Sequence, residues 1–183
     1  MKCQFLAAIC LSLVAQFIFA ADQLHPADTR QVVKVPTAVH VHFLAGMRHH
    51  LAEMADIQAA LANGEFERAA QIAQQHLGLS APGSAACRIP SMAGSPSAAQ
   101  HFASISGAQS ASADIAPYMP KAMHDAGVSM HHAADQFATV SRASAATSNY
   151  PATLRALSKV TEGCVACHAQ FRVVEDSDIQ ANE

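Results

Sequence analysis

Residues 46–64 read GMRHHLAEMADIQAALANG. In this stretch and just before it, apolar residues recur at steps of three and four, the spacing that places side chains on one helix face. Asn63 and Gly64 then end the pattern, because glycine readily adopts the left-handed conformation that closes many helices. The sequence therefore predicts a helix that begins near Thr37 and ends at this pair. Its predicted apolar face consists of Leu44, Met47, Leu51, Met54, Ile57 or Gln58, and Leu61.

Three further stretches carry the same helical spacing. A second helix is predicted over residues 65–77, where Gly78 stops it. A third begins near Pro120 and a fourth covers about residues 152–173 after Pro151, since proline is favoured at the start of a helix. The chain is rich in alanine and shows no convincing strand alternation, so we expect an all-α fold, an antiparallel four-helix bundle. The expected apolar positions of the second helix are Phe66, Ala69, Ala70, Ile72, Ala73 and Leu77. Those of the third helix are Met123, Val128, Met130 or His131, Ala134, Phe137 and Val140. Those of the fourth helix are Leu154, Leu157, Val160, Cys164, Cys167 and Phe171.

The first twenty residues have the features of a secretory signal peptide. Lys2 supplies a positive start, an apolar run extends from Phe5 to Phe19, and Ala20 is a small residue where a signal peptidase requires one. The run is short and lacks a stop-transfer flank, which favours a cleaved signal over an uncleaved anchor. We therefore expect cleavage after Ala20 and a periplasmic protein. Cleavage removes Lys2 and leaves 10 basic against 14 acidic residues, a net charge of −4 with no footprint for nucleic acid or for a membrane.

The rest of the chain is expected to hold one domain. Residues 21–36 form an extended lead-in, residues 37–175 form the helical domain and residues 176–183 form a flexible tail. Within the domain, residues 78–118 are dense in Ser, Ala, Gly and Pro, which predicts a long loop with a short helix near residues 98–105.

The cysteines supply the strongest chemical signal. Of five, Cys3 and Cys10 leave with the signal peptide, and three remain, an odd count that does not indicate a disulfide framework. Two of these belong to the stretch Cys164-Val165-Ala166-Cys167-His168. Residues three apart share a helix face, so both thiols can reach the two vinyl groups of a haem, while His168 can place its imidazole on the iron. The motif therefore predicts one covalently attached haem c.

Other interpretations of the motif fit the sequence less well. A thioredoxin-like pair would follow a strand and open a helix, whereas this pair lies late in a helical pattern. A structural zinc site would need a second pair of ligands, and the leftover Cys87 does not supply one. No constellation of carboxylates or of nucleophile and base indicates an enzyme.

The second axial ligand of the iron has several candidates. Met47 is the best candidate, on the apolar face of the first helix; Met54, Met123 and Met130 compete, and each could instead be a core residue. His49-His50 and His131-His132 are adjacent pairs that point to different helix faces, and His50 or His131 could take the place of Met47. Arg172, four residues after His168, could contact a haem propionate or could be a solvated cation at a helix C-terminus.

The stretch CVACHAQFR of residues 164–172, near the end of the chain, resembles the attachment motif of the class II c-type cytochromes, which comprise cytochrome c′ and low-spin relatives such as cytochrome c556. The opening helix from Met47 to Phe66 is similar to the first helix of the low-spin members. The resemblance spans roughly residues 37–173 and is weakest in the long loop. It implies a four-helix bundle in which His168 is the proximal ligand and Met47 matches the distal methionine.

The resemblance implies a periplasmic monohaem protein that exchanges electrons with redox partner proteins, with a homodimer as one option. An alternative is a five-coordinate haem, as in cytochrome c′, that binds nitric oxide or carbon monoxide. A third hypothesis has no haem and makes the histidine-rich surface a metal-handling module.

Overall fold

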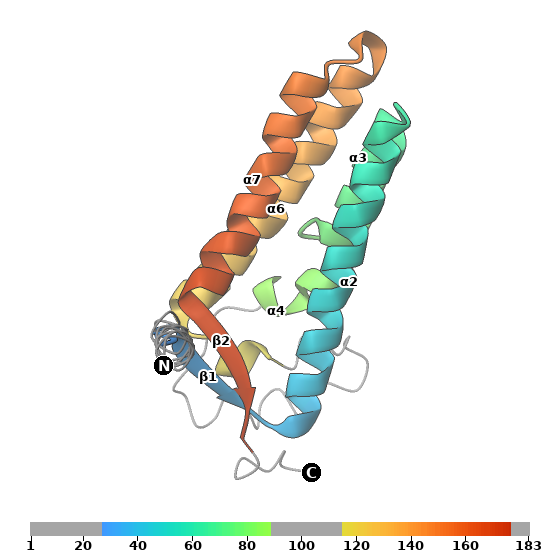
Figure 1. The fold of residues 1–183 in the computed structure, drawn as a ribbon. Coiled ribbons are helices and arrows are strands. Elements are labelled where there is room, and N and C mark those ends of the chain that lie inside the picture. The colour runs from blue at the N-terminus through green and yellow to red at the C-terminus, as the bar shows by residue number, and fades with distance from the viewer. Residues whose placement is uncertain (1–26, 89–114, 177–183) are drawn as a thin grey trace, which may run out of the picture.

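The computed structural model describes residues 27–88 and 115–176 of the chain. These residues are mostly helical, as predicted, and two short strands add a small sheet (Figure 1). The predicted signal peptide, the predicted helix near residues 98–105 and most of the predicted tail lie outside the described residues. The described elements are β1 (Gln31–Val35), α2 (Thr37–Ala62), α3 (Phe66–Ile72), the π-helix η1 (Ala73–Leu77), η2 (Pro82–Ser84), α4 (Ala85–Arg88), η4 (Ala116–Tyr118), α6 (Lys121–Ser144), η5 (Ala145–Thr147), α7 (Tyr150–Gln170) and β2 (Phe171–Glu175).

Local signals define the ends of the long helices. Gly64 has a φ of +76°, the left-handed conformation expected where the first helix stops. Pro120 stands directly before α6, which confirms the predicted start of the third helix. At the start of α7 the Asn149 side chain accepts a hydrogen bond from the backbone N–H of Ala152, which is an ordinary helix cap. The four predicted helical stretches are therefore confirmed.

The end of the fourth helix is where the prediction is wrong. α7 stops at Gln170, and residues 171–175 form β2, which pairs in parallel with β1 from Gln31↔Phe171 to Val35↔Glu175. Part of the predicted lead-in is thus a strand, although no strand was expected. Each strand is only five residues long and its partner lies far away in the sequence, so the alternation along either one is too short to detect.

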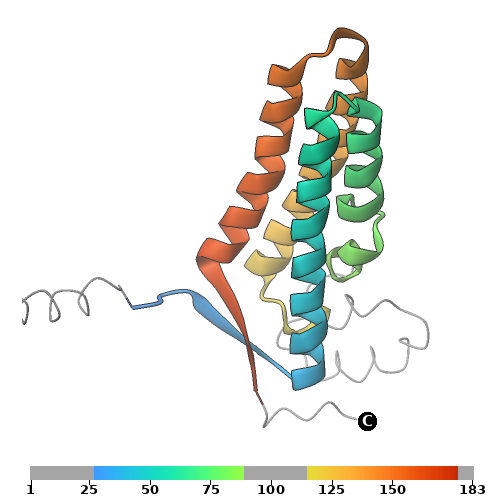
Figure 2. The same cartoon turned by 45° about the vertical axis from the view of Figure 1, so that its right-hand side comes forward.

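The long helices alternate in direction, with α2 and α6 running one way and α3 and α7 the other (Figures 1 and 2). α7 packs mainly along α6, whereas α2 packs on α3 and η1. At Gly163 the two paired helices approach so closely that an added Cβ would lie 2.8 Å from Cβ of Met130. A glycine is therefore required at this crossing, just before the first cysteine of the motif.

Buried apolar side chains form two clusters. The helical cluster lies among α2, α3, α6 and α7 and comprises Ile57, Ala60, Leu61, Phe66, Ala69, Ala70, Ala73, Leu77, Met130, Ala134, Phe137, Ala138, Leu157 and Val160. The sheet-end cluster packs the strands against the start of α6 and comprises Val33, Val35, Ala86, Ile115, Ala116, Met119, Met123 and Phe171. The start of β2 thus belongs to a second core, in which Phe171, paired with Gln31, joins Val33 and Val35 in one cluster.

The buried face of α2 differs from the predicted one. Leu51 is 72% exposed and Leu44 is 38% exposed, while His50 and Glu53 are buried. On α7, Leu154 is likewise 52% exposed instead of buried. Hydrophobicity alone favoured the leucines, but the packing of α2 against η1 and α6 turns its two polar residues inward.

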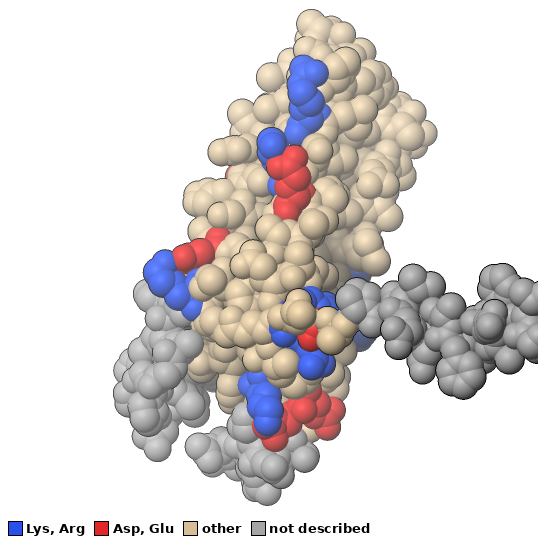
Figure 3. Space-filling view, turned by 60° about the vertical axis from the view of Figure 1, so that its left-hand side comes forward, with Lys and Arg blue, Asp and Glu red and all other residues tan. Residues whose placement is uncertain are grey.

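On the face shown in Figure 3, basic and acidic side chains lie next to each other in small groups. Uncharged surface separates one group from the next. Within residues 27–88 and 115–176, none of the helices combines the length and the apolar character needed to span a bilayer.

Candidate functional site

The two cysteines of the motif lie one turn apart on α7, both half-buried and both free thiols. Cys164 packs against the helical cluster, and Cys167 packs against the sheet-end cluster. The pair therefore bridges the two apolar cores of the molecule, with one side chain against each.

The chemical state of these thiols argues against a redox-active dithiol. Burial raises the pKa of Cys164, and burial together with the neighbouring Cys164 raises the pKa of Cys167. Cys167 lies in the last turn of α7, where the helix dipole disfavours an anion. Reactive thiol pairs have lowered pKa values instead, often at a helix N-terminus, so this environment keeps the pair protonated and slow to oxidise.

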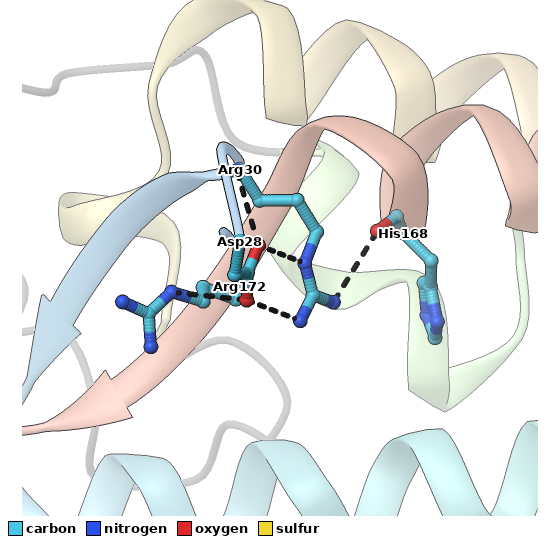
Figure 4. A network of polar contacts seen from close by, with 4 residues as sticks. All are labelled: Asp28, Arg30, His168 and Arg172. Atoms are coloured by element: carbon cyan, nitrogen blue, oxygen red, sulfur yellow. Dashed lines mark hydrogen bonds and ion pairs between the residues drawn. The ribbon is translucent and has the colours of Figure 1, made fainter. Parts of the chain in front are cut away.

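His168 directly follows the pair, in the last turn of α7. Its side chain is exposed, and its backbone oxygen accepts a hydrogen bond of 3.5 Å from Nη1 of Arg30. Figure 4 shows the imidazole extending away from the group formed by Asp28, Arg30 and Arg172. The ring is thus free of that network and available as a ligand.

Arg172 lies in β2 and not on the helix that carries His168, so the predicted fourth helix does not reach it and it is not a cation at a helix C-terminus. Its Nε lies 3.5 Å from Oδ2 of Asp28, yet this buried nitrogen has no hydrogen-bond partner. Asp28 is held mainly by Arg30, whose hydrogen bonds lower the pKa of that carboxyl (Figure 4). The Nε–H group of Arg172 therefore lacks a hydrogen-bond acceptor. The predicted contact of Arg172 with a haem propionate stays a prediction.

Met47 is half-buried on α2 and lies on the stripe that also carries Phe43 and Met54. Phe43 packs against the sheet-end cluster and Met54 against the helical cluster. Met47 therefore stands between the two cores on α2, as Cys164 and Cys167 do on α7. The competing Met123 and Met130 are buried members of the clusters themselves, which is the ordinary role of a core methionine.

His50 and His131 are both buried, and their rings meet edge to face with centroids 5.7 Å apart. Nδ1 of His131 lies 2.7 Å from the backbone oxygen of Leu77, to which it donates in one tautomer. Nε2 of His50 is buried without a hydrogen-bond partner and would lie 2.9 Å from a Cβ added at Gly83. The pair therefore joins α2 and α6 to the end of η1.

The His50–His131 pair predicts a loss of stability in acid. Burial, then the neighbouring His131 and His49, lower the pKa of His50 from 6.5 to about 4. Between these values the unfolded chain binds more protons, so His50 contributes stability that is complete above about pH 6.5 and is lost towards pH 4. We expect denaturant unfolding to show a free energy about 3 kcal/mol smaller at pH 4 than at pH 7 from this group. His50→Leu should flatten that dependence, whereas the exposed control His132→Gln should keep it; equal slopes in wild type and His50→Leu would contradict the assignment.

Two groupings were not foreseen from the sequence. Cys87, to which no role was given, packs on the sheet-end cluster beside Cys167, and burial raises its pKa to about 11. His49 and Glu53 of α2 meet His76 of η1. On a helix, the four-residue spacing of His49 and Glu53 places the two side chains next to each other. No signal in the neighbouring sequence places His76 beside them.

The residues present fit a haem c by their chemistry. Two protonated thiols lie one helical turn apart, an imidazole follows them, and a thioether occupies the corresponding stretch of α2. Compared with known proteins, the chain matches no protein-family model, no curated protein and no solved structure.

Proposed function

We propose that this chain is an exported monohaem c-type cytochrome of the four-helix-bundle kind that carries electrons in the periplasm. The observation that carries the proposal is the placement of Cys164 and Cys167, free thiols one turn apart on α7 with one apolar core against each. Thioether attachment to both vinyl groups of a haem needs two thiols on one helix face, with an imidazole adjacent for the iron.

Each residue has a distinct task in this proposal. Cys164 and Cys167 would hold the macrocycle, and His168 and Met47 would bind its iron. A haem c held in this way supplies an iron that takes up and releases one electron. The two apolar clusters each cover one of the thiols, and a methionine ligand would favour the reduced iron.

Other features of the chain agree with this role. The predicted signal peptide provides the export that haem attachment outside the cytoplasm requires. The raised pKa values of both thiols slow their oxidation to a disulfide, which would block attachment. The mixed charges of the surface suit transient encounters with redox partner proteins, and a homodimer remains compatible with the proposal.

Mass and optical measurements on the exported wild-type protein, produced with a c-haem maturation system, test the proposal. We expect the mature chain to gain the mass of one haem, retained after acid-acetone extraction, and to show a narrow reduced α band that carbon monoxide does not change. A mature chain with no added macrocycle would overturn the proposal. A high-spin spectrum that shifts with carbon monoxide would replace the electron carrier by a gas-binding haem protein.

A further inference from the structure

Three ligand-type side chains converge on the side of α2 that faces η1. His49 and Glu53 lie one turn apart on α2, and His76 comes from the π-helix η1. Oε1 of Glu53 lies 3.3 Å from Nε2 of His49 and 3.6 Å from Nδ1 of His76. The potential ligand atoms of all three residues lie within 4.8 Å of one another.

These separations match the edges of a metal coordination shell. Zinc binds imidazole nitrogen and carboxylate oxygen at about 2.0–2.1 Å, so two ligands at the tetrahedral angle lie about 3.3–3.4 Å apart. Both distances from the Glu53 oxygen lie near that value. The ligand atoms of the two imidazoles lie within 4.8 Å of each other, which forms the third edge of the group.

The carboxylate of Glu53 is the buried member of the group, and it lies near both histidines. Glu53 is 8% exposed, and an ionised carboxylate in such a place is costly unless it is paired. Its ion-pair partners among the described residues are His49 and His76. The imidazole side chains are 54% and 42% exposed, so an ion can enter from solvent and keep a water in a remaining position.

The segment that carries His76 is held in place by α6. Directly after it, the backbone oxygen of Leu77 is bound by His131, and the N–H of Leu79 donates to Oδ2 of Asp135. Gly78 lies so close to Asp135 that an added Cβ would stand 2.3 Å from Oδ1. A π-helix is a rare conformation that often marks functional positions, and here it turns His76 towards α2.

This group is separate from the proposed haem ligands. At about 100° per residue, His49 and Glu53 lie about 200° and 240° around α2 from Met47. They therefore face away from the stripe of Met47 and Met54.

We propose that His49, Glu53 and His76 bind one divalent transition-metal ion such as Zn²⁺. Water would occupy a remaining coordination position of the ion. Imidazole together with a single carboxylate suits zinc and its first-row neighbours and does not suit Mg²⁺ or Ca²⁺, which take oxygen ligands. The site needs no haem, and its failure leaves the proposed electron-carrier role intact.

Titration calorimetry with Zn²⁺ on the chelator-treated mature protein tests the site. We expect one tight site in the wild type, weakened about 100-fold or more in His49→Gln, Glu53→Gln and His76→Gln, since even partners outside the ligand shell change metal affinity 10- to 100-fold. His132→Gln, which removes an exposed histidine of α6, should bind as the wild type does.

The two histidine variants change half-exposed side chains, so a folded protein is expected, and far-UV circular dichroism checks this. The absence of a one-to-one site in the wild type would overturn the proposal. So would a site that persists in His76→Gln, because that result assigns the zinc to thiols or to other histidines.

Discussion

Replacing both Cys164 and Cys167 by serine is expected to abolish covalent haem attachment completely. A hydroxyl cannot form the thioether bond, and the two thiols are the groups that the structure presents together on α7. The exported double variant should have the mass of the bare mature chain and no haem stain on a denaturing gel. Each single serine variant should keep a fraction of the haem through the remaining thioether.

Cys87→Ser is the matched control for this experiment. Cys87 lies beside Cys167 on the sheet-end cluster and is as deeply placed as the motif cysteines, but it comes from α4 and lies outside the motif. The control should keep full haem content. Haem loss in the control, or covalent haem in the double serine variant, would show that the attachment has been assigned to the wrong thiols.

Met47→Ala is expected to open the iron of the loaded protein to carbon monoxide. The substitution removes the thioether that we assign as the distal ligand and leaves a small side chain on a half-buried position of α2. The ferrous protein should change from a spectrum insensitive to carbon monoxide to one that shifts fully on its addition. A methionine ligand also raises the reduction potential, so the potential of the variant should fall.

Met54→Ala provides the comparison for Met47→Ala. Met54 lies two turns further along the same stripe but packs, partly buried, against the helical cluster, so its loss should lower stability by about 0.5–3 kcal/mol without admitting carbon monoxide. If Met47→Ala keeps the wild-type low-spin spectrum, the ligand assignment is wrong. His50 and His131 are then less suitable replacements, because both are buried, their rings contact each other, and His131 also contacts the backbone of Leu77 in η1.

Local sequence was sufficient for the helices and for the candidate attachment site. Helical spacing, the Asn63-Gly64 stop and the prolines at helix starts act within a few residues, and the structure has the helices where they indicate. The motif of Cys164, Cys167 and His168 is also local, because one helical turn by itself brings two thiols to one face.

Contacts between distant segments decided the rest. β2 exists because residues 171–175 pair with residues 31–35, and Arg172 meets Asp28 only as a result of that pairing. The buried face of α2 was set by what packs on it, so Leu51 is exposed while His50 and Glu53 are inside.

The same physical reason explains why the metal site was not foreseen. A helix makes its own hydrogen bonds, so its position in the sequence can be read from neighbours along the chain. Which side chains meet across helices depends on how whole elements pack, as when α6 holds η1 and so brings His76 against Glu53. The sequence by itself determined the helices and the pair of thiols, and the tertiary structure decided what surrounds them.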